Sequence, residues 1–175
     1  DIADVPANVD LSFIDPADVA LLTEVSTYIN ADSAKLSGAE FNYVQQLDFL
    51  GAALEGFLVS ANFTVTDSET NLPDGRKVPL LKQTDKTWNL AVGYDKGPWD
   101  VRVSANFRGD YLDELFGATS TGVVLDRYTD DRFRLEASAK YDVNDQIQLF
   151  VEGKNLTDEP EYYYHGSTKR LSQYD

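Results

Sequence analysis

The chain has 175 residues, with 30 Asp and Glu against 15 Lys and Arg, and its formal net charge is -15. This balance argues against a nucleic-acid partner, because phosphate binding needs a clustered cationic face. The sequence holds no cysteine and a single histidine, His165, which excludes a disulfide framework, a thiol nucleophile and a Cys- or His-cluster metal centre. Hydrophobic residues make up 42% of the chain and aromatic residues 12%, so we expect a folded chain.

The first expected elements are a lead-in loop over residues 1–22 and a weak strand over residues 39–44, preceded by an extended stretch from about Glu24. A clearer strand follows at residues 57–66, where Phe57, Val59, Ala61, Phe63 and Val65 alternate with polar residues. Such a period of two places successive side chains on opposite faces of a sheet.

Two hairpins of one design come next. Residues 87–94 and 99–111 are joined by the turn at 95–98, and residues 132–141 and 147–154 by the turn at 142–145. In residues 99–111 the odd positions are apolar or glycine and the even positions polar, without a break. We therefore predict strands with one apolar and one polar face.

The links between these six strands differ at the two ends of the sheet. Short links lie at residues 95–98 and 142–145, with a somewhat longer one near 48–55. Long links lie at residues 68–84, at 112–128 and after Leu156. No run approaches the 18 or more consecutive apolar residues of a membrane-spanning helix. Long alternating strands, with short turns at one end and long loops at the other, are typical of transmembrane β-barrels.

The predicted fold class is therefore all-β, with antiparallel transmembrane β-barrel strands, short periplasmic turns and long extracellular loops. Aromatic residues near the strand ends are expected to form the membrane-interface girdle: Trp88, Tyr94, Trp99, Tyr111, Phe133 and Tyr141. Charged residues of the polar face are expected to point into the lumen: Arg102, Arg108, Arg132, Arg134, Glu136, Lys140, Glu152 and Lys154. They would line a transport path, or satisfy one another as cross-strand pairs.

A soluble β-sandwich is the alternative fold, because its strands also alternate and pack one face on a core. It would serve as a ligand-binding module, for example for carbohydrate, with the same Tyr and Trp residues. In that case Trp88 and Trp99 would lie in the core.

One segment of the sequence resembles a known family. The run from Lys154 to Pro160, which reads Lys-Asn-Leu-Thr-Asp-Glu-Pro, is followed by Tyr162-Tyr163-Tyr164 and Gly166. It closely resembles the Asn-Leu-Thr-Asp segment before the final strand of TonB-dependent outer-membrane receptors. Asn30, Gly38 and Glu40 are similar to the same family's Asn...Gly-x-Glu strand. The resemblance covers about residues 22–175.

The resemblance implies a 22-stranded barrel closed around an N-terminal plug in the outer membrane of a Gram-negative bacterium. Such receptors import a scarce nutrient, a ferric siderophore, haem, cobalamin or an oligosaccharide, with energy supplied by TonB. No plug, TonB box or final strand ending in an aromatic residue is found. We therefore expect residues 1–175 to be the C-terminal portion of the barrel. Its partners would be membrane lipid, the rest of the barrel, the plug, the TonB complex and an unidentified nutrient.

Candidate ligand-binding residues lie in the last expected extracellular loop: Tyr162, Tyr163, Tyr164, His165 and Arg170. Phenols and cations suit recognition patches. The alternative is that this loop packs on neighbouring loops, with its aromatic side chains near the membrane interface. We expect no catalytic residues, because carboxylate neighbours such as Asp113 and Glu114 would point to opposite faces of a strand. The acidic residues 1–24 lack calcium-loop spacing, so no metal or cofactor is expected.

Overall fold

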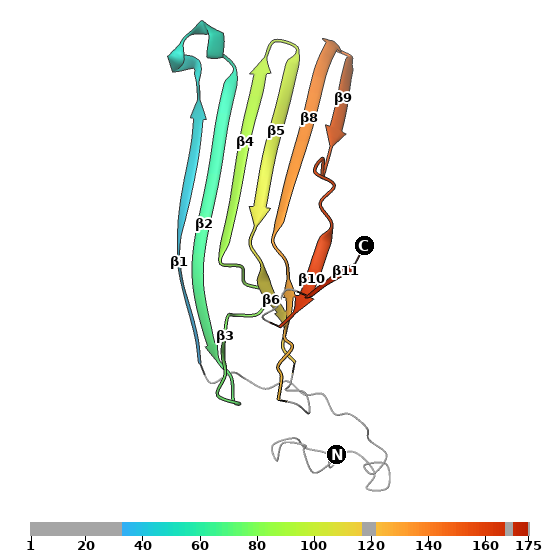
Figure 1. The fold of residues 1–175 in the computed structure, drawn as a ribbon. Coiled ribbons are helices and arrows are strands. Elements are labelled where there is room, and N and C mark those ends of the chain that lie inside the picture. Colours follow the sequence, from blue (N-terminus) through green and yellow to red (C-terminus); the bar gives the residue numbers. More distant parts are fainter. Residues whose placement is uncertain (1–32, 117–121, 167–169, 175) are drawn as a thin grey trace, which may run out of the picture.

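The computed structural model describes residues 33–116, 122–166 and 170–174. Its main feature is an open antiparallel sheet of long strands in the order β1-β2-β4-β5-β8-β9, with the short β3 paired to β2 (Figure 1). The strands are β1 Ser33–Gln46, β2 Phe57–Asn71, β3 Lys77–Val78, β4 Lys86–Lys96, β5 Trp99–Arg108, β8 Arg132–Asn144 and β9 Ile147–Gly153. The antiparallel all-β class is confirmed, and the sheet does not close on itself within these residues.

Tight turns join the long strands at one end of the sheet. Gly97, with φ 62°, sits between β4 and β5, and glycine adopts this left-handed conformation without a steric penalty. After β8, the Asn144 side-chain oxygen accepts hydrogen bonds from the backbone N–H groups of Gln146 and Ile147. Two 3-10 turns, η2 Asp48–Leu50 and η3 Ala52–Leu54, connect β1 to β2. We call this end of the strands the short-turn end.

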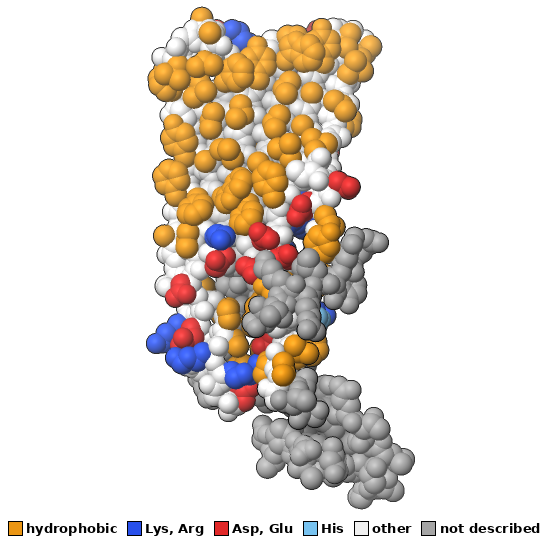
Figure 2. Space-filling model, viewed as in Figure 1, with side chains coloured by type: hydrophobic (Ala, Val, Ile, Leu, Met, Phe, Trp, Pro, Cys, Tyr) orange, Lys and Arg blue, Asp and Glu red, His pale blue; other side chains and the backbone are white. Residues whose placement is uncertain are grey.

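One face of the long strands is apolar from β1 to β9. Figure 2 shows hydrophobic side chains over this face, with charged side chains gathered mainly beneath them. Within the described residues no second sheet covers this face, and Trp99 is 47% exposed. The sandwich prediction that Trp99 lies in a core is therefore wrong. No helix in the described part of the chain is long and apolar enough to cross a membrane.

A smaller sheet lies at the opposite end of the long strands, which we call the long-loop end (Figure 1). Its strands run in the order β11-β10-β7-β6 and comprise β6 Tyr111–Glu114, β7 Arg127–Thr129, β10 Glu161–His165 and β11 Arg170–Tyr174. β6 and β7 continue β5 and β8 beyond a two-residue interruption on each strand. Leu112 and Thr129 are completely buried there. The only fully buried side chains of the described residues thus lie in this sheet.

The long links expected at residues 68–84, 112–128 and after Leu156 are partly strands. β2 extends to Asn71, β3 pairs with it, and β10 pairs with both β7 and β11. These short strands lack clear alternation, as the three successive tyrosines of β10 illustrate. Their extended form depends on partners that are distant in sequence, which is why periodicity did not reveal them.

The Asn155-Leu156-Thr157-Asp158 segment connects β9 to β10 through an irregular turn. Asn155 and Asp158 both have φ 51°, a conformation that Asn and Asp tolerate better than most residues. The Asn155 side chain donates to the Glu159 carbonyl and accepts from the Glu159 N–H. The Leu156 N–H still bonds to the Leu135 carbonyl on β8. The segment therefore leaves the main sheet while remaining attached to it.

Candidate functional site

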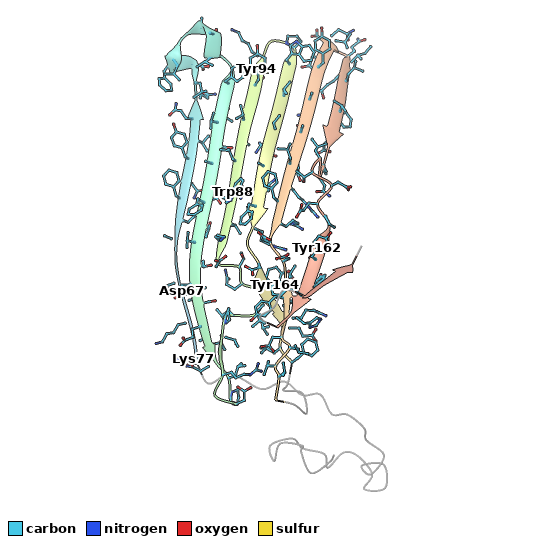
Figure 3. All side chains as sticks on the ribbon, viewed as in Figure 1. Asp67, Lys77, Trp88, Tyr94, Tyr162 and Tyr164 are labelled. Atoms are coloured by element: carbon cyan, nitrogen blue, oxygen red, sulfur yellow. The ribbon has the colours of Figure 1, made fainter. Side chains whose placement is uncertain are left out.

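The apolar face carries aromatic side chains in two zones. A register-matched row runs across five strands at the end of the band nearest the long loops: Phe41, Phe63, Trp88, Phe107 and Phe133. At the short-turn end the Phe57 and Tyr94 rings lie 4.8 Å apart and the Trp99 and Tyr141 rings 4.5 Å apart. Trp88 and Tyr94, labelled in Figure 3, show that β4 contributes to both zones.

The structure thus brings five of the six expected girdle residues into these zones. Tyr111 differs, because it lies in β6 with its ring 4.7 Å from the Arg108 guanidinium. Four further aromatic residues belong to the zones although their positions in the sequence did not single them out: Phe41, Phe57, Phe63 and Phe107. Strand register, rather than residue type, identifies them.

The opposite, polar face has an amide row, one residue away from the aromatic row nearest the long loops. Asn42, Asn62, Asn89 and Asn106 are successive register partners, and Arg134 continues the row on β8. The Asn62 amide donates to Asn42 Oδ1 at 2.6 Å and to Glu40 Oε1 at 3.0 Å. A shallow hollow of about 420 Å³ lies over this face. Sequence reasoning missed this row, which suits hydrogen bonding to a polar surface or solute.

The eight charged residues expected on the polar face are all half-buried or exposed side chains of β5, β8 and β9 or the segment that follows. Lys140 pairs across strands with Asp100 at 2.9 Å, and Lys154 pairs with Glu152 at 3.4 Å. Among the described residues, four of the eight make no ion pair: Arg102, Arg108, Arg134 and Glu136. Mutual pairing therefore accounts for only some of these charges.

At the long-loop end, ionic contacts tie the links together. The Arg76 guanidinium contacts Asp74 at 2.6 Å and Asp126 at 2.9 Å. The second Asp126 oxygen accepts the backbone N–H of Phe116 at 2.7 Å. The hydrogen bond that the Arg76 guanidinium donates to the Asp74 carboxylate raises the pKa of the Arg76 side chain. These contacts join the link between β2 and β4 to the link between β6 and β7.

The tyrosines of β10 fall on two faces. The Tyr164 ring is 6% exposed, stacks on Tyr128 with 5.2 Å between ring centroids, and donates a 2.6 Å hydrogen bond to Asp110. Burial raises the pKa of the Tyr164 phenol, and the bond to Asp110 raises it further. Tyr164 is therefore committed to packing, which removes it from the residues available to a ligand.

The other expected ligand residues of β10 are half-buried. The Tyr163 hydroxyl lies 3.4 Å from Glu161 on the same face, and Arg127 lies 5.4 Å above its ring. His165 Nδ1 lies 3.1 Å from the Leu125 carbonyl. Figure 3 shows Tyr162 on the same strand. The expected loop position of these residues is wrong, because they belong to a paired strand.

Some expected residues lie outside the described part of the structure. These are the acidic residues 1–24, Asn30 and the side chain of Arg170, whose backbone pairs with His165. Across residues 33–116, 122–166 and 170–174, no three His, Asp or Glu side chains form a group suited to holding a metal ion.

A sheet with one apolar face, aromatic zones at both ends and a polar opposite face defines the wall of a transmembrane β-barrel. Comparison with protein families matches residues 2–156 to the TonB dependent receptor-like, beta-barrel family. The chain belongs to this family, whose members are receptors and transporters of the bacterial outer membrane rather than enzymes. Searches of curated proteins and of solved structures found no significant match.

Proposed function

We propose that this chain is the C-terminal part of the barrel of an outer-membrane receptor that imports a scarce nutrient with TonB-supplied energy. The host would be a Gram-negative bacterium. The apolar face contacts membrane lipid, and the polar face lines the lumen around a plug supplied by the rest of the protein. The short turns face the periplasm and the long loops face the exterior.

The observation that carries this proposal is the register-matched apolar face. On β5, Trp99 and Phe107 mark the two aromatic zones and lie eight residues apart. At a rise of about 3.3 Å per residue, they are separated by about 26 Å along the strand. An apolar band about 25 Å tall, with aromatic residues at both borders, is what a barrel presents to an outer membrane.

The unpaired sheet edges support a larger barrel. Within the described residues β1 pairs only with β2, and β9 only with β8. Free backbone donors and acceptors are not tolerated in the lipid core. We expect further strands of the same barrel to pair with both edges.

Nutrient binding is assigned to the long-loop end. Tyr162, Tyr163 and His165 of β10 lie at this end, and Arg170 is kept as a candidate because it is the register partner of His165. Nutrients captured at this end would then pass the polar face when the plug rearranges. The nutrients considered remain a ferric siderophore, haem, cobalamin or an oligosaccharide.

Cysteine scanning tests the membrane arrangement. This chain has no native cysteine, so single cysteines at positions 101–106 of the full receptor report each face separately. With any other cysteines of the receptor replaced, a water-soluble maleimide should label positions 102, 104 and 106 and spare 101, 103 and 105. Uniform labelling would contradict the proposal.

Transport is tested by growth on each nutrient with and without the receptor, and with and without TonB. Growth that depends on the receptor but not on TonB would refute the energy coupling.

A further inference from the structure

Three arginines form a cationic cluster at the long-loop end of the polar face. Arg108 on β5 and Arg132 on β8 are direct register partners, and Arg134 follows on the same face of β8 opposite Asn106. Side chains directly opposite one another in antiparallel strands have Cβ atoms about 5 Å apart, and like charges in such pairs are destabilising. The sheet thus maintains an unfavourable arrangement that an anion would relieve.

Few groups of the chain neutralise this cluster. Arg132 lies 3.8 Å from Glu161, and Arg108 donates to the backbone carbonyl of Asp130 at 3.1 Å. Arg134 makes no ion pair or hydrogen bond with the described residues. The Nε atoms of Arg108 and Arg134 are both buried without a hydrogen-bond partner. Buried N–H groups rarely remain unpaired, because their lost hydration is not replaced.

The cluster borders a hollow of about 420 Å³. Its lining includes Thr87, Asn89 and Asn106, whose hydroxyl and amide groups are neutral donors. Glu136 also lines it, but three guanidinium groups against Glu136 and Glu161 leave a net positive charge. Guanidinium groups bind carboxylates and phosphates through paired hydrogen bonds. The volume suits one such group of a nutrient.

The position of the hollow fits the path of an incoming solute. Arg108 and Arg132 lie one residue beyond Phe107 and Phe133, so they sit just past the border of the apolar band on the opposite face. The Tyr111 ring packs on Arg108 and holds that side chain at the border. A solute entering from the long-loop end meets Arg108 and Arg132 first, and then Arg134 with the amide row that it continues.

We propose that the hollow beside Arg108, Arg132 and Arg134 binds an oxyanion group, a carboxylate or a phosphate, of the imported nutrient. This inference rests on the proposed import function. It narrows the nutrient class to compounds that carry such a group.

The test uses the full-length receptor in detergent micelles, with citrate and inorganic phosphate as separate probes. Calorimetric binding is measured at constant ionic strength, with chloride as the reference anion. Arg134→Gln should weaken binding of at least one probe tenfold or more, because charge-assisted hydrogen bonds are lost. Arg102→Gln is the matched control, since Arg102 lies on the same face outside the cluster, and it should bind like wild type.

Arg134→Lys keeps the charge and should bind with intermediate affinity, which separates lost recognition from misfolding. Heat-modifiable migration in gels verifies that each variant is folded. Absence of binding to wild type, or equal loss in Arg102→Gln and Arg134→Gln, would overturn the inference. The inference would also be overturned if the wild type bound neither probe and Arg134→Gln were less stable than the wild type. That result would mean that a carboxylate of the receptor itself fills the hollow. A receptor that supports TonB-dependent growth but binds neither probe would contradict this inference alone, whereas growth independent of TonB would contradict the proposed function.

Discussion

A charge placed on the apolar face at Val103 should destabilise the barrel far more than the same charge one residue later. Val103 lies midway between Trp99 and Phe107, with Val92 and Ala137 as its register partners on the neighbouring strands. It is 44% exposed on the apolar face. Four residues separate it from each aromatic zone, about 13 Å along the strand. Val103→Arg therefore places a guanidinium near the middle of the lipid core.

The expected cost of Val103→Arg is about 2–4 kcal/mol, the range for a cation on the lipid face at the bilayer midplane. This corresponds to about 30- to 1,000-fold in the folding equilibrium. Ser104→Arg is the matched control. Ser104 lies on the polar face directly opposite Glu136, so an arginine there gains a cross-strand partner. We expect a cost below about 1 kcal/mol for this variant.

The assay is assembly of the full receptor into lipid vesicles, followed by denaturant unfolding monitored by tryptophan fluorescence. The folded fraction of Val103→Arg should fall sharply, while Ser104→Arg should resemble wild type. Equal losses in both variants would refute the assignment of the two faces. A larger loss in Ser104→Arg would indicate that the apolar face contacts water.

Three other predictions concern the long-loop end. Asp126→Asn should weaken the contact with Arg76 and destabilise the joined links by about 1–3 kcal/mol, seen as faster amide hydrogen exchange in residues 72–80; unchanged exchange would contradict it. Tyr164→Phe should cost about 1.5–3 kcal/mol by removing the hydrogen bond to Asp110. Because burial raises the pKa of Tyr164, the stability that its neutral phenol provides is complete below the ordinary value of 10.0 and is lost as pH rises toward the higher folded-state pKa. The free energy of unfolding at alkaline pH should therefore depend less on pH in Tyr164→Phe than in wild type. Identical pH profiles of the two proteins would count against this prediction. Asn155→Ala should lower the free energy of unfolding by about 1–2 kcal/mol, because alanine tolerates φ 51° poorly and lacks both hydrogen bonds to Glu159. Thermal unfolding measures this loss, and Gln148→Ala, at an exposed position, is the control.

The sequence by itself determined the strands and their faces. Alternation in residues 57–66, 99–111 and 132–141 predicts β2, β5 and β8, because a strand places neighbouring residues on opposite sides. The turns at residues 95–98 and 142–145 predict the two hairpins. The Asn-Leu-Thr-Asp segment at residues 155–158 indicated the family to which the chain belongs.

Tertiary structure decided which residues of different strands meet. A slip of one residue would turn every side chain to the other face, and register depends on turn length and irregularities that composition does not reveal. Register alone places Arg108 opposite Arg132 and aligns the four asparagines of the amide row. The contact between Arg76 and Asp126 joins residues 50 positions apart. The burial of Tyr164 likewise depends on β7, a strand too short to be predicted without its partners.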